Sequence, residues 1–324
     1  MTQIRTLLII NHAAARVRRV WPKIKRELDA SGVEYQTYET TARGDATGKT
    51  RASLRSGINS IVVVGGDGTL SEAAEGFFEF NDDIDVLPTA INPSSTLSIL
   101  PAGTGDDFAR GLYGSRAPLQ TWIDKVVAHV RGESSEPPQT VDVLYGRCNG
   151  YEKPFICLNA STMGIGGETA GRVAAQGKFM RKFSGEFRFV FAAVGALAVW
   201  RERRVIVTVD GRTIADGPMN LIAVGNGLYC GGGMMLSPGA RLDDGKLDVI
   251  MASGLSRANV VTELSRVHTG GHVNNPKVTI VQGTIVRIET LLLQDAMPLE
   301  ADGNVRGVTP VQFQVLPGAL RFVV

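Results

Sequence analysis

The chain has 324 residues, of which 44% are hydrophobic and 20% charged, and its formal net charge is only +2. This length allows two domains with separate cores, and so small a net charge gives no field that would favour nucleic acid as a partner. The longest apolar candidate, 187–200, is shorter than the roughly 18 residues of a membrane span and contains Arg188. The three cysteines and four histidines lack metal-ligand spacing, so free thiols in a reducing cytoplasm are expected.

The first part of the chain alternates strand-like and helix-like segments. Apolar or alternating runs predict strands at 6–10, 33–37, 61–64 and 97–100. Apolar residues at helical spacing follow these runs at 17–28, 45–55, 69–78 and 119–127. Residues 81–96 are expected to form a long loop. This alternation predicts an α/β domain with a doubly wound, mainly parallel sheet.

Around residue 65, a buried strand is predicted to end in a glycine-rich turn, Gly65-Gly66-Asp67-Gly68, that leads into a helix. Glycines let backbone amides approach an anion, and the helix start adds unpaired N–H groups, so the turn suits phosphate. Asp67 would repel phosphate unless a cation lay between them, which favours a magnesium nucleotide. Taken alone, the turn is also compatible with an ordinary connection in any α/β domain.

A second glycine-rich turn follows the strand at 97–100. It reads Pro101-Ala-Gly-Thr-Gly-Asp-Asp-Phe108 and again leads into a helical pattern. In doubly wound sheets, ligands bind beyond the carboxyl ends of the strands. Because both turns lie at such ends, we expect them to face one ligand.

The pattern changes after a linker-like segment at 132–139. Short strand-like runs separated by glycine and proline continue to the end of the chain, with few helical patterns. They predict an antiparallel β-sandwich. We therefore assign residues 1–135 to the α/β domain and 136–324 to the β-sandwich domain, with the option that the last residues return to the first domain.

Two Asp-Gly turns stand out in this second half. Asp243-Asp244-Gly245 is compatible with a hairpin turn or with oxygen ligands for a hard cation. Asp302-Gly303 is compatible with a hairpin tip or with a carboxylate placed to accept a proton. The sequence by itself leaves both alternatives open.

Taken in order, four motifs resemble the soluble diacylglycerol kinase/sphingosine kinase family of lipid kinases over nearly the whole chain. They are Gly65-Gly-Asp-Gly-Thr69, Leu100-Pro-Ala-Gly-Thr-Gly-Asp-Asp-Phe-Ala109, Gly231-Gly-Gly…Pro238…Asp243-Asp-Gly-Lys-Leu-Asp248 and Asp302-Gly303. The resemblance implies an ATP-binding α/β domain like that of NAD kinases and phosphofructokinases, followed by a lipid-binding β-sandwich. It also implies an ATP- and Mg²⁺-dependent transfer of the γ-phosphate to a lipid hydroxyl, with diacylglycerol becoming phosphatidic acid in phospholipid biosynthesis.

The resemblance also assigns roles to individual residues. It implies that Asp302 is the general base, that Asp67 and Asp107 serve the Mg²⁺-phosphate network, and that a structural Mg²⁺ binds Asp244 and the backbone oxygens of Arg241 and Lys246. The ATP contacts it implies are Asn11, Thr40, Gly65, Gly66, Asp67, Gly68, Thr69, Leu70, Ser71, Glu72, Gly103 and Thr104.

Three positions depart from the family pattern. Asn11-His12-Ala13-Ala14-Ala15 replaces Asn-Pro-x-x-Gly, Asp106 stands where Asn is expected, and Asn304 where Glu is expected. An extra charge at Asp106 would oppose ATP phosphates unless a cation offset it. The alternatives are therefore a catalytically impaired nucleotide- and lipid-binding protein, or a kinase of a sphingoid base or soluble metabolite.

A lipid substrate implies contact with a membrane surface. Residues 172–204 contain eight basic and two acidic residues, and phenylalanines recur every four positions at Phe179, Phe183, Phe187 and Phe191. Such a stripe fits either an anionic membrane surface or the core of the β domain. We expect a cytoplasmic protein, in transient contact with the membrane as a peripheral protein, and the sequence is compatible with a homodimer.

Overall fold

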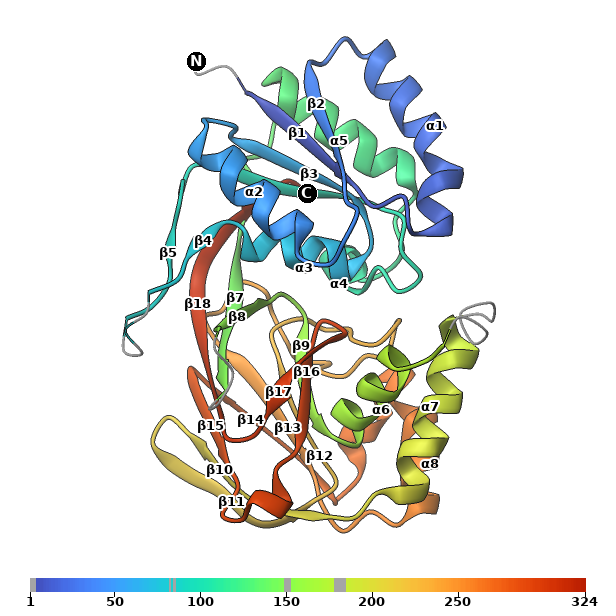
Figure 1. The fold of residues 1–324 in the computed structure, drawn as a ribbon, viewed down its shortest axis with the longest axis vertical. Helices are drawn as coiled ribbons and strands as arrows, with labels where there is room; N and C mark the ends of the chain where they lie inside the picture. Colours follow the sequence, from blue (N-terminus) through green and yellow to red (C-terminus); the bar gives the residue numbers. More distant parts are fainter. Residues whose placement is uncertain (1–3, 82, 84–85, 149–152, 178–184) are drawn as a thin grey trace. The chain divides into compact units, whose positions relative to one another are not determined.

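The computed structural model describes residues 4–81, 83, 86–148, 153–177 and 185–324, and the chain divides into two compact units (Figure 1). Unit 1 comprises Met1–Asp142 and Gly318–Val324, and unit 2 comprises Val143–Pro317. Two long strands, β7 (Gln139–Cys148) and β18 (Val311–Phe322), therefore have residues in both units.

Unit 1 is built on a parallel sheet whose strands follow the order β2–β1–β3–β6. The end of β18 adds a further parallel strand, because Arg321 and Phe322 pair with Thr96 and Leu97 of β6. The strands are β1 (Thr6–Ile10), β2 (Tyr35–Glu39), β3 (Ser60–Gly65) and β6 (Thr96–Pro101). Every residue of β1, β3 and β6 is buried, as expected for strands covered on both faces.

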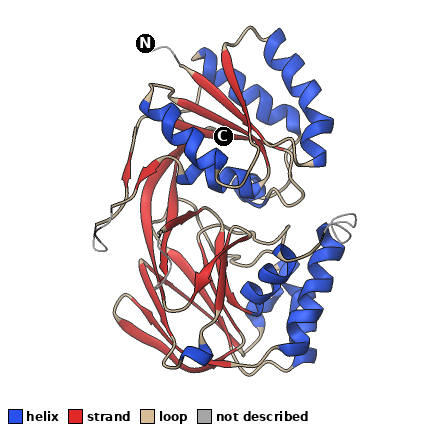
Figure 2. Ribbon diagram, viewed as in Figure 1, coloured by secondary structure: helices blue, strands red, loops and turns tan. Residues whose placement is uncertain are grey.

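Helices flank this sheet on both sides (Figure 2). Helix α1 contacts α5, and α2 contacts α3, so the helices pack as two pairs. Their bounds are α1 (Ala15–Ala30), α2 (Asp45–Arg55), α3 (Asp67–Glu75), α4 (Asp107–Tyr113) and α5 (Leu119–Arg131). The predicted doubly wound parallel sheet is confirmed.

The segment expected to be a long loop is partly ordered as a small hairpin. Strand β4 (Phe78–Glu79) pairs antiparallel with β5 (Thr89–Ala90). The loop expected over 81–96 is therefore interrupted by β5. A strand of two residues is too short to give a detectable period in the sequence.

Unit 2 contains two antiparallel sheets. One has the order β11–β10–β15–β18, with β7 paired to β18 and β8 paired to β7, and the other has the order β14–β13–β12–β9–β16–β17. A single apolar cluster draws residues from both sheets, including Val207, Val249 and Phe313. The predicted antiparallel β-sandwich is therefore confirmed. The remaining strands are β8 (Phe155–Cys157), β9 (Ala160–Gly164), β10 (Arg203–Val209), β11 (Arg212–Met219), β12 (Leu221–Gly225), β13 (Leu247–Ala252), β14 (Val278–Gly283), β15 (Ile285–Glu289), β16 (Pro298–Ala301) and β17 (Asn304–Val308).

Three helices accompany the six-stranded sheet of unit 2. They are α6 (Ile165–Ala174), α7 (Gly185–Val199) and α8 (Arg257–Arg266), and α6 contacts α7, β9 and β16. Short 3₁₀ turns follow at η2 (Val267–Thr269), η3 (Gly271–Asn274) and η4 (Leu293–Asp295). Among the described residues, no helix has both the length and the apolar character needed to cross a membrane.

Candidate active site

The two glycine-rich turns touch each other at the carboxyl edge of the parallel sheet. A Cβ atom added to Gly66 would lie 2.9 Å from the Cα of Gly103, and one added to Gly103 would lie 2.6 Å from the Cα of Gly66. Real Cβ atoms do not approach backbone this closely, so both positions require glycine. The turns after β3 and β6 therefore lie directly against each other, and that they face one ligand remains a prediction.

Two further predicted residues lie at the same edge. Asn11 follows β1, and its side-chain amide donates to Oγ1 of Thr69 at 2.9 Å. Thr40 follows β2, and its backbone N–H donates to the carbonyl of Ile10 at 2.9 Å. Asn11 and Thr40 therefore lie at the same edge of the sheet as the two glycine turns, at the ends of the neighbouring strands β1 and β2.

Three of the predicted ATP contacts, all on α3, also have structural roles within unit 1. Leu70 and Ser71 are fully buried in the helix. The carboxylate of Glu72 accepts hydrogen bonds from the backbone of Gly44 and Ala46, at the start of α2, and its burial raises its pKa. Glu72 thus satisfies N–H groups that a helix start leaves unpaired. A nucleotide role for these three side chains remains a prediction.

Two aspartates lie beside the glycine turns, Asp67 half-buried and Asp107 buried. Oδ1 of Asp67 accepts a hydrogen bond from the backbone N–H of Phe108 at 3.0 Å, which links the first turn to the start of α4. Burial, followed by the negative charge of Asp107, raises the pKa of Asp67 to about 7. Asp107 is itself only 5% exposed. Two carboxyl groups of the same charge are stabilised when a cation lies between or beside them.

The donor set around Asp67 and Asp107 fits a magnesium ion that also binds phosphate. Magnesium prefers oxygen ligands and is usually held by one or two carboxylates together with water and substrate phosphates. The described part of the chain contains no group of three or more His, Cys, Asp or Glu side chains able to hold a metal alone. A magnesium ion here would therefore depend on nucleotide phosphates for the rest of its ligands.

The unexpected charge of Asp106 is balanced by arginine. Asp106 is 3% exposed, and its Oδ2 lies 3.1 Å from Nη1 of Arg16, which also donates to the carbonyl of Gly103 at 2.7 Å. Its Oδ1 accepts from the backbone N–H of Gly103 at 2.7 Å. Arg110 and Arg116 donate to the carbonyl of Gly105 at 3.3 and 3.0 Å, respectively. Arg16 therefore provides a cation that offsets the negative charge of Asp106.

Asp302 occupies the tip of the β16–β17 hairpin in unit 2. Its φ of 47° and that of Gly303, 76°, are the two positive values that a tight Asp-Gly hairpin turn uses. Its carboxylate oxygens accept from the backbone N–H groups of Leu158 at 2.7 Å and Asn159 at 3.0 Å. Asp302 is therefore both a hairpin residue and a carboxylate held in a fixed orientation.

The Asn226-Gly227 segment supports the residues that hold Asp302. The backbone N–H groups of Asn226 and Gly227 donate to the carbonyl of Asn159 at 2.7 and 2.8 Å. The side-chain amide of Asn226 donates to the carbonyl of Leu158 at 2.8 Å. Although Asn226 and Gly227 lie far from Asp302 in the sequence, they therefore help to fix the backbone that orients its carboxylate.

The predicted structural metal site forms an exposed turn. Oδ1 of Asp244 accepts from the backbone N–H of Lys246 at 3.0 Å, and Asp243 pairs with Arg241 at 3.3 Å. Burial, opposed by a hydrogen bond from Gln282, raises the pKa of the neighbouring Asp248. The turn is thus closed by its own hydrogen bonds, and magnesium binding by Asp244, Arg241 and Lys246 remains a prediction.

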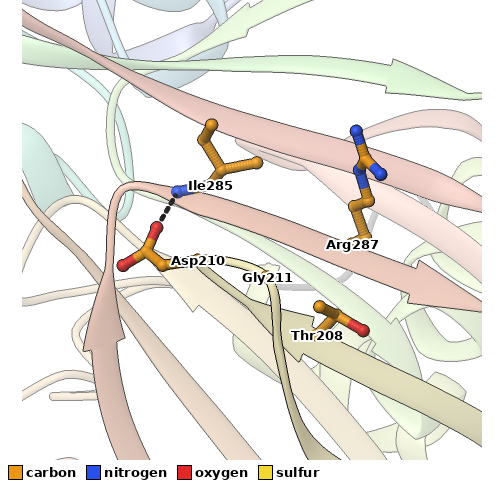
Figure 3. A pocket seen from close by; sticks show the side chains of 5 residues that line it. All are labelled: Thr208, Asp210, Gly211, Ile285 and Arg287. Carbon is orange, nitrogen blue, oxygen red and sulfur yellow. Dashed lines mark hydrogen bonds between the residues drawn. The ribbon is translucent and has the colours of Figure 1, made fainter.

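A hollow in unit 2 is lined by none of these residues (Figure 3). It is lined by Thr208, Asp210, Gly211, Ile285 and Arg287. The carboxylate of Asp210 accepts from the backbone N–H of Ile285 at 2.9 Å and from Thr284. It therefore links the end of β10 to the start of β15. The hollow contains no predicted site residue, and we assign it no chemistry.

Comparison with known proteins agrees with these features. Residues 5–139 match the family described as "Diacylglycerol kinase catalytic domain", and residues 163–324, half of the chain, match "YegS C-terminal NAD kinase beta sandwich-like domain". The chain belongs to the diacylglycerol kinase-like family of lipid kinases. It is therefore an enzyme of the transferase class.

Relatives align along most of the chain. It is 27% identical to "Diacylglycerol kinase" of Staphylococcus carnosus over 298 residues, which cover 91% of this chain and 86% of that protein. It is also 27% identical to "Probable lipid kinase YegS-like" of Xanthomonas axonopodis pv. citri, with 90% and 86% covered.

Solved structures agree on the fold. A diacylglycerol kinase structure from Bacillus anthracis superposes with a TM-score of 0.65 at 23% identity and covers 100% of this chain and 97% of that one. Yeast NADH kinase in complex with NADH superposes with a TM-score of 0.53 at 9% identity, covering 99% and 83%. At these sequence identities, the structural similarity shows the fold alone.

Sequence reasoning missed some residues around the glycine turns of unit 1 and around the Asp302 hairpin of unit 2. Arg16 and Arg116 fix the second glycine turn, and Glu300 lies fully buried two residues before Asp302. The requirement for a cation near Asp106 was a usable signal for Arg16. No local pattern distinguishes Glu300 from an exposed strand glutamate.

Proposed function

We propose that this lipid kinase transfers the γ-phosphate of MgATP to the hydroxyl group of diacylglycerol. The observation that carries the proposal is the contact between Gly66 and Gly103, with the carboxyl groups of Asp67 and Asp107 beside it. The name of the S. carnosus relative supports diacylglycerol as the acceptor. The proposal makes phosphatidic acid the product and places the enzyme in phospholipid biosynthesis.

On the nucleotide side, backbone groups do most of the binding. Gly66 and Gly68 leave N–H groups accessible at the start of α3, where the helix dipole favours a phosphate. No atom lies within 4 Å of a Cβ position at Gly68, so its surroundings are open on that side. Asp67 and Asp107 would hold Mg²⁺, which supplies positive charge against the phosphates when it is bound. Phosphoryl transfer needs little else from a protein than such positioning and charge neutralisation.

On the acceptor side, Asp302 is the proposed base. Its backbone donors hold the carboxylate in one orientation, and a carboxylate within hydrogen-bond reach of the lipid hydroxyl accepts its proton as the oxygen attacks phosphorus. The Arg16–Asp106 ion pair favours an active enzyme over an impaired one, because the extra charge at Asp106 is already neutralised.

The test is transfer of labelled phosphate from ATP to lipids in detergent micelles. Diacylglycerol, monoacylglycerol, ceramide and sphingosine are compared, with and without Mg²⁺, using the wild type and Asp302→Asn. We expect labelled phosphatidic acid with wild type only when Mg²⁺ is present, and none with Asp302→Asn. Preferential labelling of sphingosine would replace diacylglycerol by a sphingoid base, and ATP binding with no lipid labelled would indicate a binding protein.

We also propose that α7 contacts the membrane that holds the lipid. Phe191, Val194 and Val199 on this helix are 60%, 61% and 63% exposed, whereas Ala192 and Ala196 are buried. Burial in the core is therefore wrong for Phe191. Phe179 and Phe183 lie outside the described residues, as do Lys178, Arg181 and Lys182.

The contact is proposed to be mainly apolar. Among the described basic residues of 172–204, Arg172, Arg201 and Arg204 pair with Glu168, Asp295 and Asp216 at 3.0, 3.2 and 3.7 Å. These charges are partly neutralised within the protein. Insertion of exposed apolar side chains at the interface then contributes more than attraction to anionic lipids.

Co-sedimentation with vesicles tests this contact. Phe191→Ser/Val194→Ser is expected to reduce binding to phosphatidylcholine vesicles, whereas Val261→Ser, a change at a residue of α8 that is 55% exposed, should not. Equal binding by all three proteins would remove α7 from the membrane interface.

A further inference from the structure

Glu300 is a fully buried acid that the mechanism above does not use. It is 4% exposed and lies on β16, two residues before the base. Its Oε2 accepts from the backbone N–H of Gly303 at 2.7 Å, and its Oε1 accepts from Oγ1 of Thr162 at 2.7 Å. A buried carboxyl group is costly to ionise, so its presence beside a catalytic turn calls for a reason.

The hydrogen bonds of Glu300 close the turn that carries Asp302. The backbone of Asp302 donates to the carbonyl of Ala160 at 3.1 Å, and Ser161 Oγ donates to the carbonyl of Glu300 at 2.6 Å. β9 therefore holds the hairpin on one side, and the Glu300 carboxyl group fixes Gly303 from inside it. This matters because Asp302 has a positive φ, which needs such support in a residue other than glycine.

We propose that Glu300 is a positioning residue for Asp302: it fixes the Asp302–Gly303 turn, and its negative charge favours the arrival of the substrate proton at Asp302. The inference rests on the proposed role of Asp302 as the base. The two carboxyl groups repel each other when both are charged. That repulsion disappears when Asp302 accepts the proton, so an ionised Glu300 favours the transfer.

The surroundings leave these two acids as the principal charges of the cluster. The thiol of Cys157 faces both of them, and burial raises the pKa of this thiol well above its usual range, so it stays neutral. On α6, which packs against β16, Glu168 pairs with Arg172 at 3.0 Å. On β17, Arg306 lies 5.2 Å from the ring of Phe155.

The charge of Glu300 changes within the working range of an enzyme. Burial, and to a lesser extent the charge of Asp302, raise the pKa of Glu300 to about 7, against the hydrogen bonds of Thr162 and Gly303. Glu300 is therefore neutral below this pH and negatively charged above it. The rate of phosphoryl transfer should therefore rise as Glu300 ionises.

The kinetic experiment compares pH profiles of kcat/KM for the wild type, Glu300→Gln and Thr162→Val between pH 5.5 and 9. The wild type is expected to rise through about pH 7 by about tenfold, which corresponds to one pKa unit. Glutamine can still accept from the N–H of Gly303 and can donate to Oγ1 of Thr162, but it cannot ionise, so its profile should lack this rise. Thr162→Val removes a donor that favours the ionised form, so its rise should move to higher pH. A Glu300→Gln profile that keeps the rise would overturn the proposal.

A second measurement needs no substrate and separates this inference from the proposed function. The carboxyl carbon of Glu300 is followed by ¹³C NMR, with Glu300→Gln providing its assignment. Its titration midpoint should fall in Asp302→Asn, because the repelling charge is gone. An unchanged midpoint would refute the coupling even if lipid is phosphorylated, and failure to phosphorylate any lipid would refute the proposed function while leaving the coupling measurable.

Discussion

Removing the arginine that balances Asp106 should destabilise the second glycine turn. Arg16→Ala leaves the Asp106 carboxylate, which is 3% exposed, without the ion pair at 3.1 Å. Breaking a buried ion pair from one side costs about 3–5 kcal/mol. Because the Arg16 side chain is itself 43% exposed and solvent screens the pair, we expect roughly 1–3 kcal/mol in the free energy of unfolding.

Removing the charge instead should cost little. In Asp106→Asn, the amide oxygen can still accept from the N–H of Gly103, and asparagine tolerates the φ of 52° at this position. The double variant Arg16→Ala/Asp106→Asn should therefore be more stable than Arg16→Ala alone. This gives a coupling free energy of about 1–2 kcal/mol between the two positions.

Urea unfolding of the four proteins of this double-mutant cycle measures the coupling. Arg19→Ala serves as the control, since Arg19 is an exposed arginine of the same helix. Additive effects, with no coupling between positions 16 and 106, would refute the idea that Arg16 neutralises Asp106. In activity assays, Asp106→Asn should lower the KM for ATP, because Arg16 is then left with an unbalanced positive charge beside the proposed phosphate site.

Three further outcomes follow from the site geometry. Asp302→Asn should abolish phosphate transfer in the micelle assay and leave the protein folded, with the free energy of unfolding lowered by about 1–3 kcal/mol because the side-chain NH₂ cannot accept from one of the two backbone N–H donors; substantial remaining activity would exclude Asp302 as the base. Gly66→Ala should destabilise the protein because its Cβ would meet Gly103. Gly68 has open space around it and lies in a helix, so Gly68→Ala should keep the stability or raise it by up to about 1 kcal/mol. The same change should weaken ATP binding, which calorimetry measures. The folded state raises the pKa of Glu300 from 4.5 to about 7, so its stabilising contribution is present below pH 4.5 and lost as pH rises through 7. Glu300→Gln should therefore gain up to roughly 3 kcal/mol relative to the wild type between pH 5 and 8.5 in urea unfolding, and parallel curves for the two proteins would contradict this.

The sequence by itself determined the elements that depend on local pattern. The mainly apolar runs at 61–64 and 97–100 are buried strands, and the glycine turns that end them could be placed because no other residue allows such close backbone approach. The Asp302-Gly303 hairpin tip was equally readable, because its positive φ values suit these two residue types. Periodicity and turn chemistry are short-range properties, so a linear chain displays them.

Only the tertiary structure decided which side chains meet. Arg16 reaches Asp106 across 90 positions of sequence, and Asp302 is held by Leu158 and Asn159 across 144 and 143 positions. The family resemblance placed Glu72 among nucleotide contacts, which remains a prediction, and only folding shows that its carboxylate also accepts from the N–H groups at the start of α2. Phe191 belonged to a stripe that suited core and membrane equally, and packing left it exposed. Charge and burial at a site depend on neighbours brought together by folding, and these long-range pairings leave no period in the sequence from which they could be inferred.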